Sequence, residues 1–173
     1  MAALSNNPTN KNFLSPTAFK FEIARMPTFT YFVQSVQFPE LNLGYTDLNT
    51  PFNRLSVEGD HTKFGNLNVT FKLDEDMYSY LEIYDWMTGV GKPRSFDQYA
   101  NLKYQEAGTG KGLYSEGQLT FLTNSKNPNI NITFADMYPI NLGNFRMDST
   151  VEDVNYVTAD VTFNFFDYVY SRI

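Results

Sequence analysis

The sequence contains no cysteine and a single histidine, His61. The absence of cysteine excludes disulfide bonds, thiolate metal sites and cysteine nucleophiles. One histidine cannot build a multi-histidine zinc site, and it leaves little scope for imidazole relays. No long apolar run is present, which predicts that no helix of this chain crosses a membrane. Residues 1–13 have neither a basic region nor an apolar stretch, so we expect no secretory signal.

Charged residues make up only 18% of the 173 residues, against about 25% in an average protein. Acidic residues outnumber basic ones by 19 to 13, which gives a net charge of -6. Such a chain repels phosphate groups and is not expected to bind nucleic acid. Aromatic residues reach 17%, from 16 Phe, 12 Tyr and 1 Trp. Because aromatic side chains favour strands and provide large contact areas, the composition favours an all-β protein whose surface is partly covered by partners.

The first third of the chain predicts two strands and a long connection. Apolar residues alternate in Phe19–Ile23, which predicts a strand. Phe29–Phe38 predicts a returning strand with a bulge near Ser35, so that the two strands form a hairpin. Residues 40–65 are interpreted as a long connection with a turn at Val57–Asp60.

The rest of the chain predicts strands around one helix. Asn66–Leu73 is the clearest strand, because its apolar and polar residues alternate without interruption. Asp74 is a good N-cap for a helix over Glu75–Thr88. Further strands are predicted at Gln118–Thr123, Asn129–Phe134 and Val157–Phe166.

The chain is long enough for one domain. Residues 1–18 are rich in Asn, Pro, Thr and Ser and predict a flexible N-terminal arm. Residues 19–173 then form a single β domain. Its one interruption is residues 91–117, which are rich in Gly and Lys and predict an exposed loop or hairpin insertion.

Patterns that could carry chemistry are incomplete. Gly108–Gly112 resembles a phosphate-binding loop, but the residue after Lys111 has no hydroxyl and the first glycine is missing. The carboxylates of Asp74–Asp76 precede a helix and do not follow the alternate spacing of a calcium loop. His61 has no GxSxG nucleophile motif to serve. We therefore expect no catalytic site, no metal ion and no cofactor.

The segment Pro51–Phe71 leads from an arginine through a Gly-Asp pair to a Val-Thr-Phe strand and then to the helix. This arrangement resembles the central signature of the tail tube proteins of contractile-tailed bacteriophages. The match is carried by Arg54, Gly59, Asp60, Thr62, Phe64, Val69, Thr70 and Phe71. Ile132–Gly143 and Ala159–Tyr168 resemble the closing strands, with Pro139 in the turn before the penultimate strand.

The resemblance implies an antiparallel β-barrel or sandwich subunit with one flanking helix. Six such subunits are expected to close a ring, and rings to stack into the inner tube of a contractile tail, through which DNA passes without specific binding. The implied partners are other copies of the chain, the sheath, the baseplate and tail-completion proteins, with no membrane. The implied location is the virion, assembled in the host cytoplasm. Residues 1–18 and 91–117 have no core pattern and are candidate contacts between subunits or rings.

The alternating strands provide an apolar face and a polar face. The core-facing set is Leu67, Val69, Phe71, Ile130, Ile132, Phe134, Val157, Val161, Phe163 and Phe165. The polar set, which the resemblance places on the channel wall, is Asn66, Asn68, Thr70, Asn129, Asn131, Thr133, Thr158, Asp160, Thr162 and Asn164. A wall of Asn and Thr offers phosphates few cations that would hold them. Strands of an ordinary β-sandwich with one face in solvent show the same alternation of apolar and polar residues, so the pattern alone supports both interpretations.

Other functions also fit the sequence. The resemblance extends to the baseplate proteins that initiate the tube and to the tube proteins of type VI secretion, and one sequence does not separate a tube initiator from a tube subunit. A carbohydrate-binding β-sandwich could use Tyr45, Trp86 and Tyr99 to stack on sugars. A hydrolase built on His61 and Asp60 is the third alternative.

Overall fold

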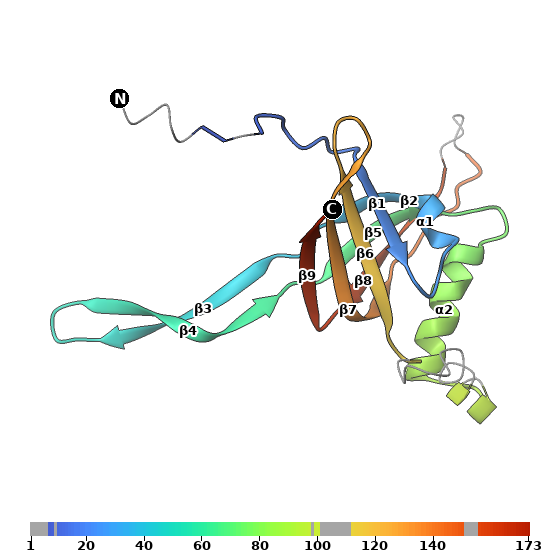
Figure 1. Cartoon of the computed structure of the whole chain (residues 1–173). Helices are drawn as coiled ribbons and strands as arrows, with labels where there is room; N and C mark the ends of the chain where they lie inside the picture. Colours follow the sequence, from blue (N-terminus) through green and yellow to red (C-terminus); the bar gives the residue numbers. More distant parts are fainter. Residues whose placement is uncertain (1–6, 9, 98, 101–111, 151–155) are drawn as a thin grey trace.

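The computed structural model describes residues 7–8, 10–97, 99–100, 112–150 and 156–173 (Figure 1). Its strands are β1 (Phe19–Ile23), β2 (Val33–Gln37), β3 (Leu41–Asn49), β4 (Arg54–Phe64), β5 (Leu67–Lys72), β6 (Ser115–Leu122), β7 (Pro128–Leu142), β8 (Thr158–Asn164) and β9 (Asp167–Arg172). Helix α1 spans Phe29–Phe32 and helix α2 spans Tyr78–Gly91. Residues 101–111, which include part of the predicted insertion and of the Gly108–Gly112 motif, lie outside the described residues.

The main sheet is antiparallel, with the strand order β1-β6-β7-β8-β5-β2 and with β9 also paired to β7. Strand β7 has 15 residues, and its two parts have different neighbours. Its first part pairs with β6 and β9, and its last part pairs with β8. The order ends at β1 and β2, which are not paired with each other, so the sheet is not closed. This architecture confirms the predicted all-β, antiparallel class.

One hydrophobic core lies between the two parts of this sheet. The half that contains β1, β6 and the start of β7 contributes Phe21, Ile23, Leu119, Ile132 and Phe134. The half that contains β5 and β8 contributes Leu67, Val69, Phe71, Ala159, Val161 and Phe163. The predicted core-facing residues are therefore buried, except that Ile130 and Val157 are half-buried.

Helix α2 covers one side of this core with Ile83 and Trp86, which are both buried. The Trp86 ring lies 6.5 Å from the Phe163 ring, measured between centroids. The indole Nε1 of Trp86 donates a hydrogen bond to the carbonyl oxygen of Leu113 at 3.1 Å, and the guanidinium of Arg25 lies 4.9 Å from the centre of the ring. Trp86 therefore joins α2 to β8 and to the segment that leads into β6.

The helix begins later than the sequence predicts. In place of Glu75–Thr88, α2 begins at Tyr78, because Met77 has a left-handed backbone with φ of 55°. The Asp74 carboxylate still accepts a hydrogen bond from the Tyr78 N–H at 3.0 Å. It thus supplies the partner that a free helix N-terminus needs, but from four residues before the first turn. The helix ends at Gly91, three residues beyond the predicted end at Thr88.

The predicted hairpin over Phe19–Phe38 is wrong. Strand β1 pairs with β6, and β2 pairs with β5, so the two segments lie at opposite ends of the strand order. Phe29–Phe32 forms α1 between them. Alternation shows that a segment has a buried face, but it does not identify the strand that pairs with it. The expected bulge is confirmed, because the β2–β5 register shifts between Val33 and Ser35.

The predicted connection over residues 40–65 is a long antiparallel hairpin, β3–β4, which projects from the main sheet (Figure 1). Its turn lies at residues 50–53, and the expected turn at Val57–Asp60 lies inside β4. The two strands have nine and eleven residues and pair only with each other. Most of their side chains are exposed, so the hairpin has no buried face of its own.

Five aromatic side chains anchor the base of this hairpin. Phe38 precedes β3, and Phe64 ends β4. The Phe38 ring lies 5.4 Å from that of Tyr168, and the Phe64 ring lies 5.1 Å from Tyr168 and 5.9 Å from Phe165. Phe134 completes the group, at 5.0 Å from Phe165. We call these five residues the junction cluster; it ties both ends of the hairpin to β7 and β9.

The closing strands differ from the prediction in two ways. Pro139 does not occupy a turn, since β7 continues through it to Leu142. The predicted strand Val157–Phe166 corresponds to β8 alone, and a further strand, β9, follows it that the sequence analysis did not predict. The break between the two strands falls at Phe165 and Phe166, and the Phe166 N–H still donates to the Ala135 carbonyl of β7 at 3.0 Å.

Phe134→Ala should lower the free energy of unfolding by about 3–5 kcal/mol, because it leaves a cavity among fully packed rings. Phe52→Ala is the matched control: this ring is 95% exposed in the hairpin turn, and its loss should cost less than about 0.5 kcal/mol. Urea unfolding monitored by circular dichroism measures both. Similar losses from the two variants would show that the junction cluster is not part of the stable core.

Candidate functional site

A polar face runs across β5 and β8, on the side away from the core. Asn68 and Thr70 lie opposite Thr162 and Asp160 in the register. The Thr70 hydroxyl donates to the Asp160 carboxylate at 2.7 Å, and the Thr162 hydroxyl donates to the Asn68 side-chain oxygen at 2.9 Å. Thr158 continues the row opposite Lys72. The structure therefore brings five of the predicted wall residues onto one face, and two hydrogen bonds link four of them in pairs.

Sequence reasoning missed how far this face extends. On the edge strand β2, Gln37 lies opposite Asn68 and accepts a hydrogen bond from its amide at 3.4 Å. Ser35 lies opposite Thr70. On β5, Lys72 adds a positive charge that balances the negative charge of Asp160. Its ammonium lies 4.8 Å from the centre of the Tyr156 ring. The face is thus polar, with one charge of each sign.

Three other predicted wall residues do not join it. Asn129, Asn131 and Thr133 lie on the first part of β7, where Thr133 pairs with Gln118 of β6 and with Val169 of β9. Their neighbours Ile132 and Phe134 point into the core, so these polar side chains point outward on the opposite half of the sheet. The remaining two stand at the margins: Asn66 precedes β5, and Asn164 donates to the Tyr138 hydroxyl at 3.2 Å.

Helix α2 and the β5–β8 polar face lie on opposite sides of the sheet. Phe163 points to the core, while its neighbours Thr162 and Asn164 alternate to the other side. Trp86 of α2 contacts Phe163, so α2 lies on the core side of β8. A surface that approached the polar face would therefore meet β2, β5 and β8, and α2 would point away from it.

The residues that carry the sequence resemblance occupy two places. Val69, Thr70 and Phe71 lie on β5, where Val69 and Phe71 are buried. The others, Arg54, Gly59, Asp60, Thr62 and Phe64, lie along β4 of the projecting hairpin. Among these, position 59 requires a glycine, because a Cβ there would lie 2.5 Å from the carbonyl oxygen of Gly44 on β3. Phe64 is a member of the junction cluster.

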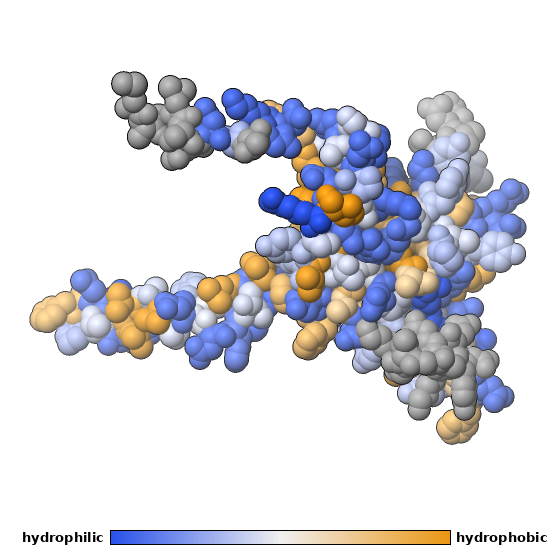
Figure 2. Space-filling view, in the orientation of Figure 1, coloured by the Kyte–Doolittle hydropathy of each residue, from blue (hydrophilic) through white to orange (hydrophobic). Residues whose placement is uncertain are grey.

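The hairpin exposes many large apolar side chains (Figure 2). The residues concerned, each more than half exposed, are Leu41, Leu43, Tyr45, Leu48, Phe52 and Leu55. Exposed apolar patches of this kind on a projecting element mark an interaction site. Sequence reasoning missed it, although the alternation of Leu41, Leu43 and Tyr45 with polar residues was a signal for a strand.

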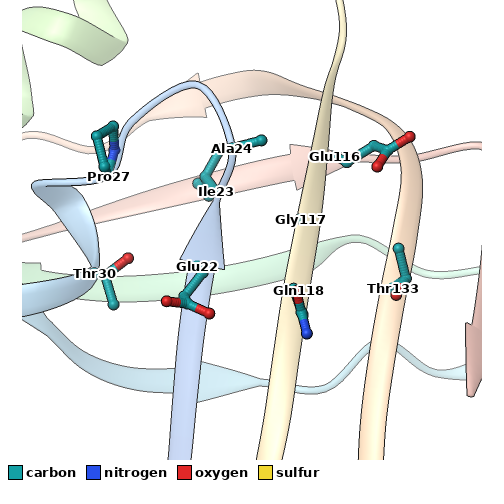
Figure 3. A pocket seen from close by; sticks show the side chains of 9 residues that line it. All are labelled: Glu22, Ile23, Ala24, Pro27, Thr30, Glu116, Gly117, Gln118 and Thr133. Atoms are coloured by element: carbon teal, nitrogen blue, oxygen red, sulfur yellow. The ribbon is translucent and has the colours of Figure 1, made fainter. Parts of the chain in front are cut away.

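A hollow of about 340 Å³ lies beside β1 and β6 (Figure 3). Its described lining includes the carboxylates Glu22 and Glu116 and the hydroxyls Thr30 and Thr133. Glu22 is already paired with the Lys20 ammonium at 2.5 Å. No described lining residue is a histidine or lysine that could activate a hydroxyl, so the hollow offers no arrangement for nucleophilic catalysis.

The residues of the alternative functions are dispersed. Trp86 is 1% exposed, so it cannot stack on a sugar, whereas Tyr45 lies on the hairpin. Asp60 and His61 lie on β4, opposite the irregularity at Gly44. Within the described residues, no group of three or more acidic or histidine side chains is placed to hold a metal ion. Also among these residues, no helix is long and apolar enough to cross a membrane.

Solved structures with the same fold come from contractile injection systems. The tube-terminating cap of the anti-feeding prophage aligns over 100% of both chains, with a TM-score of 0.68 and 8% identity. A chain of the PVC sheath–tube complex aligns over 94% of both chains, with a TM-score of 0.65 and 10% identity. The PVC sheath/tube terminator gives a TM-score of 0.57 at 11% identity, over 94% of this chain and 99% of that chain.

No protein-family model matches the sequence, and no curated protein matches it. At identities near 10% the structural likeness establishes the fold. That fold is the one the sequence resemblance predicted, and the proteins that share it are structural parts of tubes and their terminators rather than enzymes. The chain thus has the fold of the tube and tube-terminating proteins of contractile injection systems.

Proposed function

We propose that this chain is the subunit of the inner tube of a contractile phage tail. Six copies close a ring, rings stack into a tube, and DNA passes through the channel without specific binding. The observation that carries the proposal is the β3–β4 hairpin, which holds large apolar side chains in solvent and packs against the core only at its base, through Phe64. The shared fold with tube and tube-terminating proteins supports it.

Self-association is the simplest way to cover the hairpin. Exposed leucine and aromatic side chains on a projecting ribbon are unfavourable in water unless a partner removes them from it. With strands of nine and eleven residues, the hairpin approaches the 20 to 30 residues that one side of a stable interface typically has. In a tube of identical subunits, every copy supplies both the hairpin and the surface that receives it.

The β5–β8 polar face is the proposed channel wall. With β2 and the last part of β7, this half of the sheet supplies four strands. Six copies would give a barrel of roughly 48 Å backbone diameter, at a strand spacing of about 4.8 Å and a tilt near 40°. The polar residues on the other half of the sheet, including Asn131 and Thr133, would then lie away from the channel. Helix α2 would point outward, toward the sheath.

A second candidate is a terminating or baseplate component built on the same fold. It is favoured by the likeness to the tube-terminating cap, which extends over the whole of both chains. The two candidates differ in copy number, since a tube contains many rings and a terminator or initiator contains one. Quantitative mass spectrometry of purified particles separates them.

Replacing Asn42–Lys63 by a two-residue turn should abolish tube formation and leave the fold intact, because the removed residues belong to no part of the core. Sedimentation velocity and negative-stain microscopy measure assembly, and thermal unfolding measures the fold. The conservative variant Glu58→Gln, on a polar part of the same hairpin, should assemble normally. Tubes of normal length from the shortened chain would refute the proposal that the hairpin holds subunits together.

Lysines on the proposed channel wall should make the tube retain DNA. Asn68→Lys with Thr162→Lys adds two cations per subunit to the β5–β8 face, where phosphates would bind them in a salt-dependent manner. Cosedimentation of assembled tubes with short duplex DNA, at low and high salt, measures retention. Asn131→Lys with Thr133→Lys is the matched control on the other half of the sheet. Stronger retention by this control pair would place the channel on the wrong half.

A further inference from the structure

The two faces of the hairpin have different chemistry at its base. Leu41, Leu43 and Tyr45 share one face of the ribbon, because every second side chain of a strand points the same way. Phe64 lies opposite Leu41 on this face and joins it to the junction cluster. The other face carries Asn42, which lies opposite Lys63. We call Leu41, Leu43 and Tyr45 the base patch; its three side chains are 57%, 54% and 76% exposed.

Toward the tip the chemistry of the two faces is exchanged. The face of the base patch continues with Asp47, whose carboxylate accepts a hydrogen bond from the Ser56 hydroxyl at 2.6 Å. The opposite face becomes apolar, with Leu48 directly across from Leu55 and Val57 two pairs further in. We call Leu48, Leu55 and Val57 the tip patch. Leu48 and Leu55 are 51% and 57% exposed.

An irregularity interrupts the ribbon within the base patch, just before Tyr45. Between the pairs Leu43–Thr62 and Tyr45–Glu58, β3 has one residue and β4 has three. The backbones are close at this point, because a Cβ on Gly59 would lie 2.5 Å from the Gly44 carbonyl oxygen. Both strands keep their alternation through the irregularity, so the faces are continuous and the change in chemistry comes from the residues themselves.

The hairpin is also long compared with the domain that carries it. Nine residues of extended strand span roughly 30 Å, while a chain of about 150 residues has a radius of gyration near 15 Å. The base patch adjoins its own domain through the junction cluster, and the tip patch stands far from it. A partner that covers the base patch on one face therefore leaves the tip patch open on the other.

We propose that each hairpin is held between two other copies of the chain. The base patch docks on the neighbouring copy in the same ring, and the tip patch docks on a copy in the next ring. This inference rests on the proposed function, because it requires the chain to assemble with itself. It goes further by assigning the two contacts to opposite faces of one ribbon.

Photocrosslinking in the assembled full-length protein tests this directly. Benzoylphenylalanine replaces Leu43 in one variant and Leu55 in another, and tubes are formed from a mixture of isotopically labelled and unlabelled chains. Mass spectrometry then identifies each crosslinked peptide and shows whether it joins two chains. Both positions should crosslink between chains, and the two acceptor segments should differ.

Two pairs of substitutions provide an independent readout. Leu41→Asn with Leu43→Asn removes the base patch and should raise the concentration needed for ring formation at least tenfold. Leu48→Asn with Leu55→Asn removes the tip patch and should leave rings that do not stack. Asp47→Asn with Glu58→Gln is the matched control on polar positions and should form normal tubes. Analytical ultracentrifugation and negative-stain microscopy distinguish single chains, rings and tubes.

The outcomes separate this inference from the proposed function. One acceptor segment for both crosslinkers, or the same assembly defect from both pairs of substitutions, would show a single partner surface that follows the twisted ribbon and would overturn the inference alone. A wild-type chain that forms neither rings nor tubes would overturn the proposed function and this inference together.

Discussion

The packing of aromatic rings in the junction cluster is the contact on which the rest of the architecture depends. Phe134 and Phe165 belong to the core, while Phe38 and Phe64 are the last residues that the hairpin shares with it. Tyr168 of β9 touches both groups. Rings packed edge to face are worth about 0.5–1.5 kcal/mol beyond the area they bury, and their geometry is directional. The cluster therefore fixes the direction in which an otherwise unsupported ribbon leaves the sheet.

The sequence predicted the strands with one buried and one wet face. In β5 and β8 each apolar residue is buried and each polar residue points outward, so alternation located both strands within a residue or two. It failed where a strand has no buried face, as in β3 and β4, whose side chains are mostly exposed. The prediction also failed for β7, where Pro139 indicated a turn. Pro139 lies on the last part of this strand, which pairs with β8, and a strand tolerates proline where one of its sides has no neighbour.

Alternation also explains why the candidate site was predicted only in part. Asn68, Thr70, Asp160 and Thr162 were correctly grouped, because β5 and β8 are adjacent strands. Asn131 and Thr133 have the same alternation but lie on the half of the sheet across the core. Periodicity reports that a side chain points outward, whereas the direction of "outward" depends on how the sheet curves around the core. Strand β7 contributes to both halves, and no local pattern marks the point where it passes from one to the other.

A ribbon that lies outside the core is released from the constraints of folding. Substitutions in the core must preserve close packing, but those along β3 and β4 need only suit the surface that receives them. If the chain assembles with itself as proposed, two proteins with the same internal packing could diverge in this ribbon until neither accepts the other into its assembly. A cell that produces two such assemblies at once would keep them separate by this means, without any change to the scaffold that the two subunits share.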